Sequence, residues 1–391
     1  MEEIRTGIVG IGNMGFAHAA CIYAGRVKGM RLAALCDTDG KKLCRARAEF
    51  DGVKLFDTYE KLFASGLIDA VIIAVPHRLH GEIAAAAFAA GLDVMTEKPE
   101  DISISAARKM NEAARKSGKV FGIMFNQRTN PLYRKARELV QGGRLGELKR
   151  SVWIITNWYR TQGYYDSGGW RATWAGEGGG VLINQAPHNL DLWQWICGMP
   201  SAVTAFCDTA KYHNIEVEDD ATVFARYPNG ATGTFITSTG EYPGTNRFEI
   251  SGTRGKLVIE NGMLKLWEND ADDREMCYNT KISPDNVSVK YREYIPETAE
   301  TAHMGVLQSF ADCILRGSPL IAEGSEGINS LEISNAAYLS EWTGNKEIKL
   351  PLRGEEFDGY LRRKMATSAF TEETDGGLAD GEYKKRWQVQ W

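Results

Sequence analysis

The 391-residue sequence predicts an α/β protein with an N-terminal Rossmann domain, a doubly wound parallel sheet, followed by an α+β domain built on a large, open, mostly antiparallel sheet. Short apolar segments alternate with helical patterns up to about residue 125, which is the pattern of βαβ units. From residue 202 to about residue 289, alternating polar and apolar segments are separated by turn signals, as in antiparallel strands. A single hydrophobic core also stops growing well below this chain length, so two domains are expected.

The expected elements of the first domain alternate without interruption. Apolar strand candidates cover residues 4–9, 32–36, 53–56, 68–75, 93–96 and 120–124, and helical patterns cover 41–50, 58–65, 82–90 and 103–116. In an open parallel sheet, ligands bind outside the carboxyl ends of the strands. Residues that directly follow each strand are therefore the first candidates for a binding site.

The first strand candidate leads into a glycine motif, Gly10-Ile11-Gly12-Asn13-Met14-Gly15, and then into a helical pattern. Glycines in this context allow a tight turn and a close approach of the backbone to a pyrophosphate, which faces the helix N-terminus. The second strand ends at Asp37, about 20 residues further on, where an acid binds the ribose hydroxyls and repels a 2′-phosphate. The sequence therefore predicts a dinucleotide site that prefers NAD to NADP.

Composition excludes several classes of partner. The net charge is −5, and Lys and Arg are scattered along the chain, which argues against a nucleic-acid or anionic-membrane partner. The seven cysteines are odd in number and have no CxxC spacing, so we expect neither disulfides nor a metal site. No segment approaches the roughly 18 apolar residues of a membrane span, and the N-terminus lacks a signal-peptide pattern. A cytoplasmic protein with a small soluble ligand is expected.

The fifth strand candidate ends at Glu97-Lys98-Pro99, and we take Lys98 as the chemical centre. Because it follows a strand of the parallel sheet, its side chain would face the cofactor and the reacting group. Proline after the lysine suggests a cis peptide bond that fixes the lysine's direction. His80, at the start of the preceding helix, is either a cofactor contact or a capping residue.

The segment from residue 159 to 174 of the second domain is rich in Trp, Tyr and Arg and is flanked by glycines. Aromatic faces stack on the apolar faces of sugars while polar groups bind hydroxyls, so this loop suits a sugar. A packed loop with ordinary aromatic anchors is the alternative for each single residue. Beyond Glu177-Gly178-Gly179-Gly180, a helix is expected over residues 181–195, on which Asn184, His188 and Asp191 share one face.

With its glycine motif, the acid after the second strand and Glu-Lys-Pro after the fifth, the chain resembles the glucose-fructose oxidoreductase, inositol dehydrogenase and MocA family over about residues 4–350. In that family a triple glycine precedes an acid and, four residues later, a histidine that works with the lysine. His188 matches the histidine, whereas Asn184 stands where the family has the acid. The amide can hold a sugar hydroxyl but cannot accept a proton.

Three regions are expected: an NAD-binding domain over residues 1–125, a domain for substrate binding and oligomerisation over 126–350, and a C-terminal tail over 351–391. The tail is charged, so we expect it to be partly extended, with Trp387 and Trp391 docked on a neighbouring surface. The resemblance also implies a homodimer or homotetramer that pairs through the open sheet. The expected catalytic residues are Lys98, His188 and Asn184, with Asp191 orienting His188. The expected cofactor contacts are Gly10, Gly12, Asn13, Met14, Gly15, Asp37, Pro76, His80, Glu97, Lys98 and Gln127. The expected substrate contacts are Lys98, Asn126, Arg128, Tyr159, Tyr165, Trp170, Arg171, Trp174, Asn184 and His188.

The leading hypothesis is an NAD-dependent dehydrogenase that oxidises a secondary hydroxyl of a sugar or cyclitol. His188 would take the hydroxyl proton, and Lys98 would stabilise the developing alkoxide. Trp170, Arg171 and Trp174 with the triple-glycine segment resemble the levoglucosan and glucoside 3-dehydrogenase branch, which implies oxidation at C3. The alternatives are an inositol dehydrogenase, a redox-assisted glycosidase in which Tyr159, Tyr164 or Tyr165 supplies an extra acid or base, and a non-catalytic NAD(H)-binding sensor or scaffold.

Overall fold

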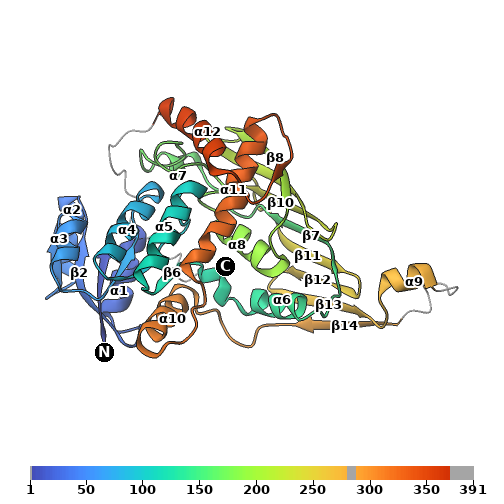
Figure 1. Ribbon diagram of the computed structural model, residues 1–391, viewed down its shortest axis with the longest axis horizontal. Coiled ribbons are helices and arrows are strands. Elements are labelled where there is room, and N and C mark those ends of the chain that lie inside the picture. Colours follow the sequence, from blue (N-terminus) through green and yellow to red (C-terminus); the bar gives the residue numbers. More distant parts are fainter. Residues whose placement is uncertain (1, 280–287, 370–391) are drawn as a thin grey trace.

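The computed structural model describes residues 2–279 and 288–369 and contains two sheets (Figure 1). The first is a six-stranded parallel sheet in the order β3-β2-β1-β4-β5-β6. Its strands are β1 (Ile4–Val9), β2 (Met30–Cys36), β3 (Lys54–Phe56), β4 (Ala70–Ile73), β5 (Asp93–Thr96) and β6 (Phe121–Ile123). All six predicted strands are confirmed. The strand order reverses between β1 and β4, which places a crevice at the carboxyl ends of these two strands.

The helices of this domain are α1 (Asn13–Tyr23), α2 (Gly40–Glu49), α3 (Tyr59–Ala64), α4 (His80–Ala89) and α5 (Ile104–Ser117). They differ in how they begin, and α2, α3 and α5 start at side-chain caps. Asp39, Thr58 and Ser103 precede α2, α3 and α5, and each accepts a hydrogen bond from a backbone N–H of the first turn. Such caps satisfy donors that the helix itself leaves unpaired. No capping side chain precedes α1, so its N-terminal N–H groups are left for another partner.

The second sheet has nine strands in the order β14-β13-β12-β11-β7-β10-β9-β8-β15. These are β7 (Leu148–Ile155), β8 (Ala202–Thr209), β9 (Glu218–Arg226), β10 (Thr232–Ser238), β11 (Asn246–Gly252), β12 (Gly255–Glu260), β13 (Met263–Asn269), β14 (Val289–Tyr294) and β15 (Ile348–Lys349). Only β7 and β10 pair in parallel; the other pairs of this sheet are antiparallel. The predicted, mostly antiparallel sheet is therefore confirmed.

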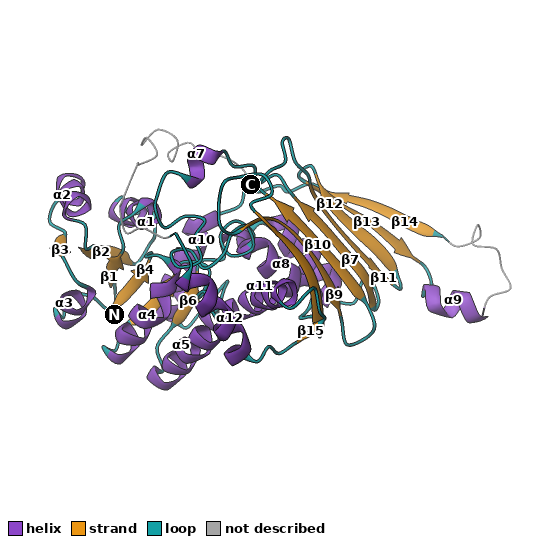
Figure 2. Cartoon of the chain, turned by 90° about the horizontal axis from the view of Figure 1, so that it is seen from above, coloured by secondary structure: helices purple, strands orange, loops and turns teal. Residues whose placement is uncertain are grey.

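One face of the large sheet is covered by helices, and the other is open. Figure 2 shows α8 (Pro187–Cys197) and α11 (Gly327–Trp342) between the two sheets. With α6 (Pro131–Gln141) they cover an apolar core that includes Trp153, Trp193 and Phe235. On the other face Phe206 and Phe224 are 57% and 36% exposed. The helix α10 (Ala302–Arg316) returns to the Rossmann domain, where Phe310 joins the core with Ile8.

Two expectations for the second domain are wrong. The helix predicted from residue 181 begins only at Pro187, because the segment 181–186 forms turns and proline favours the first helical position. The tail, predicted to be partly extended, begins with a helix, α12 (Gly354–Ala366), whose Phe357 and Leu361 are buried in the core. Trp387 and Trp391 lie outside the described residues. The short helices α7 (Gln162–Tyr165) and α9 (Asp273–Asn279) were not expected.

Within residues 2–279 and 288–369, no helix is long and apolar enough to cross a membrane. The same residues contain no group of three or more His, Cys, Asp or Glu side chains arranged to hold a metal ion.

Candidate functional site

The glycine motif forms a cradle at the crevice between β1 and β4. Gly10 has φ +86°, and a Cβ on Gly15 would lie 1.8 Å from the Gly10 carbonyl oxygen, so both positions require glycine. A Cβ on Gly12 would meet no atom within 4 Å, which shows that this part of the loop borders open space. Asn13 and Met14, in the uncapped first turn of α1, are exposed and partly exposed. Open space beside unpaired helix N–H groups fits a pyrophosphate.

Asp37 lies beside this loop at the end of β2. Its carboxylate accepts hydrogen bonds from the backbone N–H groups of Ile11 (2.8 Å) and Asp39 (2.9 Å), which fix its position next to the glycine motif. The residues present therefore fit NAD, with Asp37 at the place of the adenosine ribose.

Lys98 lies two residues beyond the end of β5, and its peptide bond to Pro99 is cis, as predicted. Its Nζ donates a 2.7 Å hydrogen bond to the carbonyl oxygen of Asn184 in the second domain. Burial lowers the pKa of Lys98, and the carboxylate of Glu97 opposes that shift. Burial acts to raise the pKa of Glu97, but the hydrogen bond with His18 (2.7 Å) and the charges around it bring this pKa to about 2. Glu97 is therefore an anion that keeps positive charge at Lys98.

His188 lies in the first turn of α8, after Pro187. Its ring packs edge-on against Phe125, with ring centroids 6.2 Å apart, and its Nδ1 is buried with no hydrogen-bond partner. Burial, followed by the positive charge of Lys98, lowers the pKa of His188 well below its ordinary value. His188 is therefore a neutral imidazole that can accept a proton, and it lies close enough to Lys98 to sense its charge.

Asp191 does not orient His188, and this expectation is wrong. Both of its carboxylate oxygens accept hydrogen bonds from Arg128, at 2.7 and 2.8 Å, and one also accepts from Gln194. Arg128 is 1% exposed and also pairs with Glu326. This buried ion pair joins the start of the second domain to α8. The guanidinium of Arg128 is thus used within the protein, which does not fit its expected role as a substrate contact.

Asn184 lies in the turns before α8, and a carboxylate that was not predicted lies beside it. This carboxylate belongs to Glu177. Its Oε1 accepts a hydrogen bond from the Nδ2 of Asn184, and its Oε2 accepts one from the backbone N–H of Ala172 at 2.7 Å. Glu177 is 1% exposed, and burial raises its pKa to about 7. The only sequence signal for it was an acid next to a triple glycine.

Tyr164 is the second unpredicted contact of Asn184. Its hydroxyl oxygen accepts from Arg171 at 3.0 Å and lies 3.4 Å from the Asn184 Nδ2. Trp170 stacks edge-on against the buried His77 of the Rossmann domain, with ring centroids 6.0 Å apart. The predicted residues Trp170 and Arg171 therefore border the same region as Lys98 and Asn184.

Two of the predicted loop contacts belong to the protein interior. Trp174 is 5% exposed and packs against Tyr338 and Trp342. Tyr165 is 6% exposed, and its hydroxyl is hydrogen-bonded to Thr239 at 2.8 Å. These aromatic rings anchor the loop, so the structure does not place them as substrate contacts. Tyr159, by contrast, is 43% exposed.

Among the remaining predicted residues, some are likewise buried and others are exposed. His80 is fully buried, with its ring nitrogens 2.8 Å from the Pro99 carbonyl and 2.9 Å from the Val75 carbonyl, so it supports the lysine segment rather than facing the cofactor. Pro76 is exposed beyond the carboxyl end of β4. Asn126 and Gln127 are buried in the short helix η2 (Asn126–Thr129).

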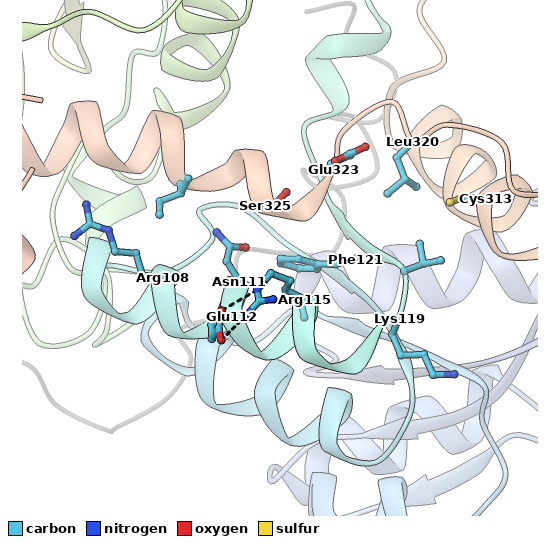
Figure 3. A pocket seen from close by; sticks show the side chains of 14 residues that line it. Arg108, Asn111, Glu112, Arg115, Lys119, Phe121, Cys313, Leu320, Glu323 and Ser325 are labelled. Atoms are coloured by element: carbon cyan, nitrogen blue, oxygen red, sulfur yellow. Dashed lines mark hydrogen bonds and ion pairs between the residues drawn. The ribbon is translucent and has the colours of Figure 1, made fainter. Parts of the chain in front are cut away.

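A surface hollow elsewhere in the molecule has no part in this site. Figure 3 shows its lining, where α5 and the start of β6 face Glu323 and Ser325. Its volume is about 650 Å³. It lies at the amino end of β6, opposite the strand ends that position Lys98, and its Arg115 is already paired with Glu112 at 2.8 Å.

Two family models match the chain. Residues 4–125 match the oxidoreductase family with an NAD-binding Rossmann fold, and residues 133–258 match the C-terminal domain of the GFO/IDH/MocA family. The chain belongs to the GFO/IDH/MocA oxidoreductase family. Together with the glycine cradle and Asp37, this membership makes it an NAD-dependent oxidoreductase.

Similar proteins agree with this assignment along most of the chain. The scyllo-inositol 2-dehydrogenase (NAD(+)) of Bacillus subtilis is 25% identical over 346 residues, which cover 86% of this chain and 93% of that protein. The WlbA dehydrogenase of Bordetella pertussis, solved with NADH and UDP-GlcNAcA, is 26% identical, with a TM-score of 0.75 over 90% of this chain and all of that one. Levoglucosan dehydrogenase with NADH and levoglucosan has a TM-score of 0.74 at 21% identity, over 89% of this chain and 100% of that one, and shares the fold.

Proposed function

We propose that the protein is a dehydrogenase that uses NAD to oxidise a secondary hydroxyl, at C3, of a pyranose sugar, glycoside or anhydrosugar. The observation that carries the proposal is that Lys98 of the Rossmann domain donates a 2.7 Å hydrogen bond to the carbonyl of Asn184 in the second domain, four residues before His188, whose pKa is lowered by burial and by the Lys98 charge. The relatives support a hydroxylated ring as substrate, since one is named for scyllo-inositol and another was solved with UDP-GlcNAcA.

In this proposal, His188 and Lys98 both act on the substrate hydroxyl group, each in a different role. NAD, when bound, supplies the acceptor for the hydride that leaves the carbinol carbon. His188 accepts the hydroxyl proton, which its neutral state allows. The Lys98 ammonium donates a hydrogen bond to the same oxygen and stabilises its developing negative charge. The carbon thus loses a hydride and the oxygen a proton, which leaves a ketone.

The loop around Trp170 supplies the sugar-binding surface in this proposal. Trp170 and Arg171 are partly exposed beside Lys98's partner Asn184, and Arg171 lies over both the Trp170 and the Tyr164 rings at 4.7 Å. An indole face can cover the apolar side of a sugar ring while the amide of Asn184 and the guanidinium bind hydroxyls. Tyr159, which is 43% exposed, and Asn126, whose Oδ1 has no hydrogen-bond partner within the described part of the chain, are proposed as further contacts.

The test is a panel of glucosides, anhydrosugars and inositols incubated with NAD, in which reduced nicotinamide is followed by absorbance and the ketone is located by mass spectrometry and NMR. We expect turnover on a pyranose with the ketone at C3. Turnover only on inositols would make the protein an inositol dehydrogenase. NADH binding without turnover on any member would favour a sensor or scaffold and would contradict the proposal.

One observation favours a second candidate, a redox-assisted glycosidase. Such an enzyme oxidises C3, eliminates the aglycone after loss of the C2 proton, adds water to C1 of the resulting enone, and reduces the C3 ketone again. The hydroxyl of Tyr164 lies 3.4, 3.3 and 3.0 Å from nitrogens of Asn184, Gln185 and Arg171, so it is held beside the site as an additional acid or base. Aglycone release without accumulation of NADH would identify this activity.

We also propose that two copies pair through the open face of the large sheet. The exposed rings of Phe206 and Phe224 on neighbouring strands support this assembly. Light scattering of the purified protein measures it directly.

A further inference from the structure

The buried carboxylate of Glu177 is the feature of the site that the proposed chemistry leaves unused. It enters from the second domain directly before Gly178-Gly179-Gly180. A Cβ on Gly178 would lie 2.4 Å from Ile102, and one on Gly179 would lie 2.2 Å from the Tyr338 hydroxyl. This packing leaves the Glu177 backbone little freedom. The carbonyl oxygen of Glu177 is also held by the Nδ1 of His77, 3.0 Å away in the Rossmann domain.

The side chain of Glu177 connects to Lys98 in two steps. Its Oε1 accepts from the Asn184 side chain, and the Asn184 backbone carbonyl accepts the 2.7 Å hydrogen bond from the Lys98 ammonium. Its other oxygen accepts from the N–H of Ala172, which has φ +51°. Glu177 therefore ties together a strained turn, the amide of Asn184 and, through Asn184, the lysine.

We propose that Glu177 is a positioning residue of the active site, whose carboxylate holds Asn184, and through it Lys98, and supplies the negative charge that residue 184 lacks. The inference rests on the proposed role of Lys98. The charged and titratable groups that face Glu177 are Arg171 in its own loop, Lys98 after β5, His77 of the Rossmann domain, and Tyr164 and Tyr165 in α7.

The protonation state of Glu177 then matters near neutral pH. Burial raises its pKa to about 7, while Arg171, the Ala172 N–H, Lys98 and Asn184 act in the opposite direction. When Glu177 is ionised, its charge favours the ammonium form of Lys98, so turnover rises with pH through about 7.

The variant Glu177→Gln isolates the charge from the hydrogen bonds. The glutamine oxygen can still accept from Ala172, and its amide can still meet a rotated Asn184 side chain. We expect kcat to fall about 10- to 100-fold, since the hydrogen bonds from Ala172 and Asn184 lose their charged partner, and the rise in turnover near pH 7 to disappear. The double variant Glu177→Gln/Asn184→Asp moves the carboxylate to the other partner of the same contact. We expect its kcat to be at least about tenfold higher than that of Glu177→Gln.

A second readout needs no sugar. Lys98 is acylated with acetic anhydride at a series of pH values and quantified by mass spectrometry; the midpoint should move to lower pH in Glu177→Gln. Glu218→Gln is the matched control, because Glu218 is equally buried, also has a raised pKa of about 7, and contacts Gly180, Leu182 and Tyr338 instead of Asn184. This control should keep both the pH profile and the labelling midpoint of the wild type.

The inference is overturned if Glu177→Gln keeps kcat within about threefold and leaves the labelling midpoint unchanged, or if only Glu218→Gln removes the rise near pH 7. Should Glu177→Gln fail to fold, Asn184→Ala removes the contact from its other side and should shift the Lys98 midpoint in the same direction. A wild-type protein that oxidises no sugar refutes the proposed function, while the labelling experiment still decides the role of Glu177.

Discussion

The two walls of the active site are held in place by different physical means. On the Rossmann side, the glycine cradle and Lys98 follow strands β1 and β5, so hydrogen bonds of the parallel sheet fix their positions. On the other side, the loops carry little regular structure, and buried or partly buried carboxylates bind their backbone N–H groups. These acids and their partners are Glu177 with Ala172, Glu216 with Trp174 and Ala369, Glu218 with Gly180 and Leu182, and Asp219 with Lys211, Tyr212 and His213.

Because of this difference, substitutions on the two sides of the active site should have different effects. A backbone N–H buried in a loop costs free energy unless it is paired, and an anion pairs with it more strongly than a neutral group does. Substitution of a charged residue on the Rossmann wall should therefore change the reaction more than the fold, whereas substitution of an acid on the other wall, with the exception of Glu177 beside Asn184, should change the fold of the loops first.

The largest expected effect is that of Lys98→Met. Turnover should fall by roughly three orders of magnitude or more, because the ammonium group that donates to the proposed reacting oxygen is removed. NADH affinity should stay within about threefold, since the glycine cradle and Asp37 are untouched. Steady-state kinetics on the best sugar of the panel and fluorescence titration with NADH measure the two quantities.

Thermal stability sharpens the same test. Burial of the Lys98 ammonium opposes its charged form, and an apolar side chain of similar length removes that cost. We therefore expect an unchanged or higher Tm for Lys98→Met. A lower Tm together with near-normal turnover would show that the lysine is structural and would remove the contrast between the walls.

The Rossmann wall was predictable because its rules are local in sequence. Six apolar runs, a glycine motif and the tripeptide Glu97-Lys98-Pro99 each give their position within a few residues, and the cis bond after Lys98 was among the predictions. In the second domain the family pattern identified His188, but the helix that carries it starts later than periodicity suggested. Pro187 marks that start, and the turns before it have no periodicity to detect.

The roles of the carboxylates were not predictable in this way. Glu177 and Glu216 belong to no motif that assigns them a role, and each is held in part by a backbone N–H group, which no sequence pattern marks. The distance along the chain adds to the problem, since Glu216 contacts Trp174 and Ala369, 42 and 153 residues away. The same long-range packing turned Trp174 from an expected sugar contact into a core residue.

The next effect in size is expected for Glu216→Gln. Glu216 accepts from the N–H of Trp174 at 2.6 Å and of Ala369 at 2.7 Å, and also from the Ser368 hydroxyl. An amide in its place turns an NH₂ group toward one of these donors, and the loss should reach about 2–3 kcal/mol. We expect a Tm lower by several degrees and faster proteolysis of the 159–177 loop.

Asp166→Asn is the control for this variant. Asp166 is an exposed acid of the same loop whose carboxylate binds only a side chain, that of Gln162, among the hydrogen bonds described. Its substitution should change Tm by less than about one degree, since exposed polar contacts contribute little. Equal effects of the two variants would show that charge in the loop, and not pairing with backbone N–H groups, determines its stability.

The smallest effect concerns the pH dependence of stability and comes from Glu218. Burial raises its pKa from 4.5 to about 7. The folded protein therefore holds a proton on Glu218 that the unfolded chain has released, so the stabilisation is complete below pH 4.5 and is lost as the pH rises through about 7. Between pH 6 and pH 7 this single group should lower the free energy of unfolding by roughly 1 kcal/mol.

Glu218→Gln tests that sign, because the amide resembles the protonated acid and has no charge to lose. Urea unfolding at pH 5, 6, 7 and 8 should show a smaller decrease in stability with pH for the variant than for the wild type. Lys98→Met gives the comparison from the other wall, since it leaves Glu218 and its three partners in place and should keep the wild-type decrease. If Glu218→Gln instead shows the steeper decrease, the Glu218 carboxylate is stabilised by the N–H groups of Gly180 and Leu182 more than burial destabilises it, and these acids act as anchors at every pH above 5.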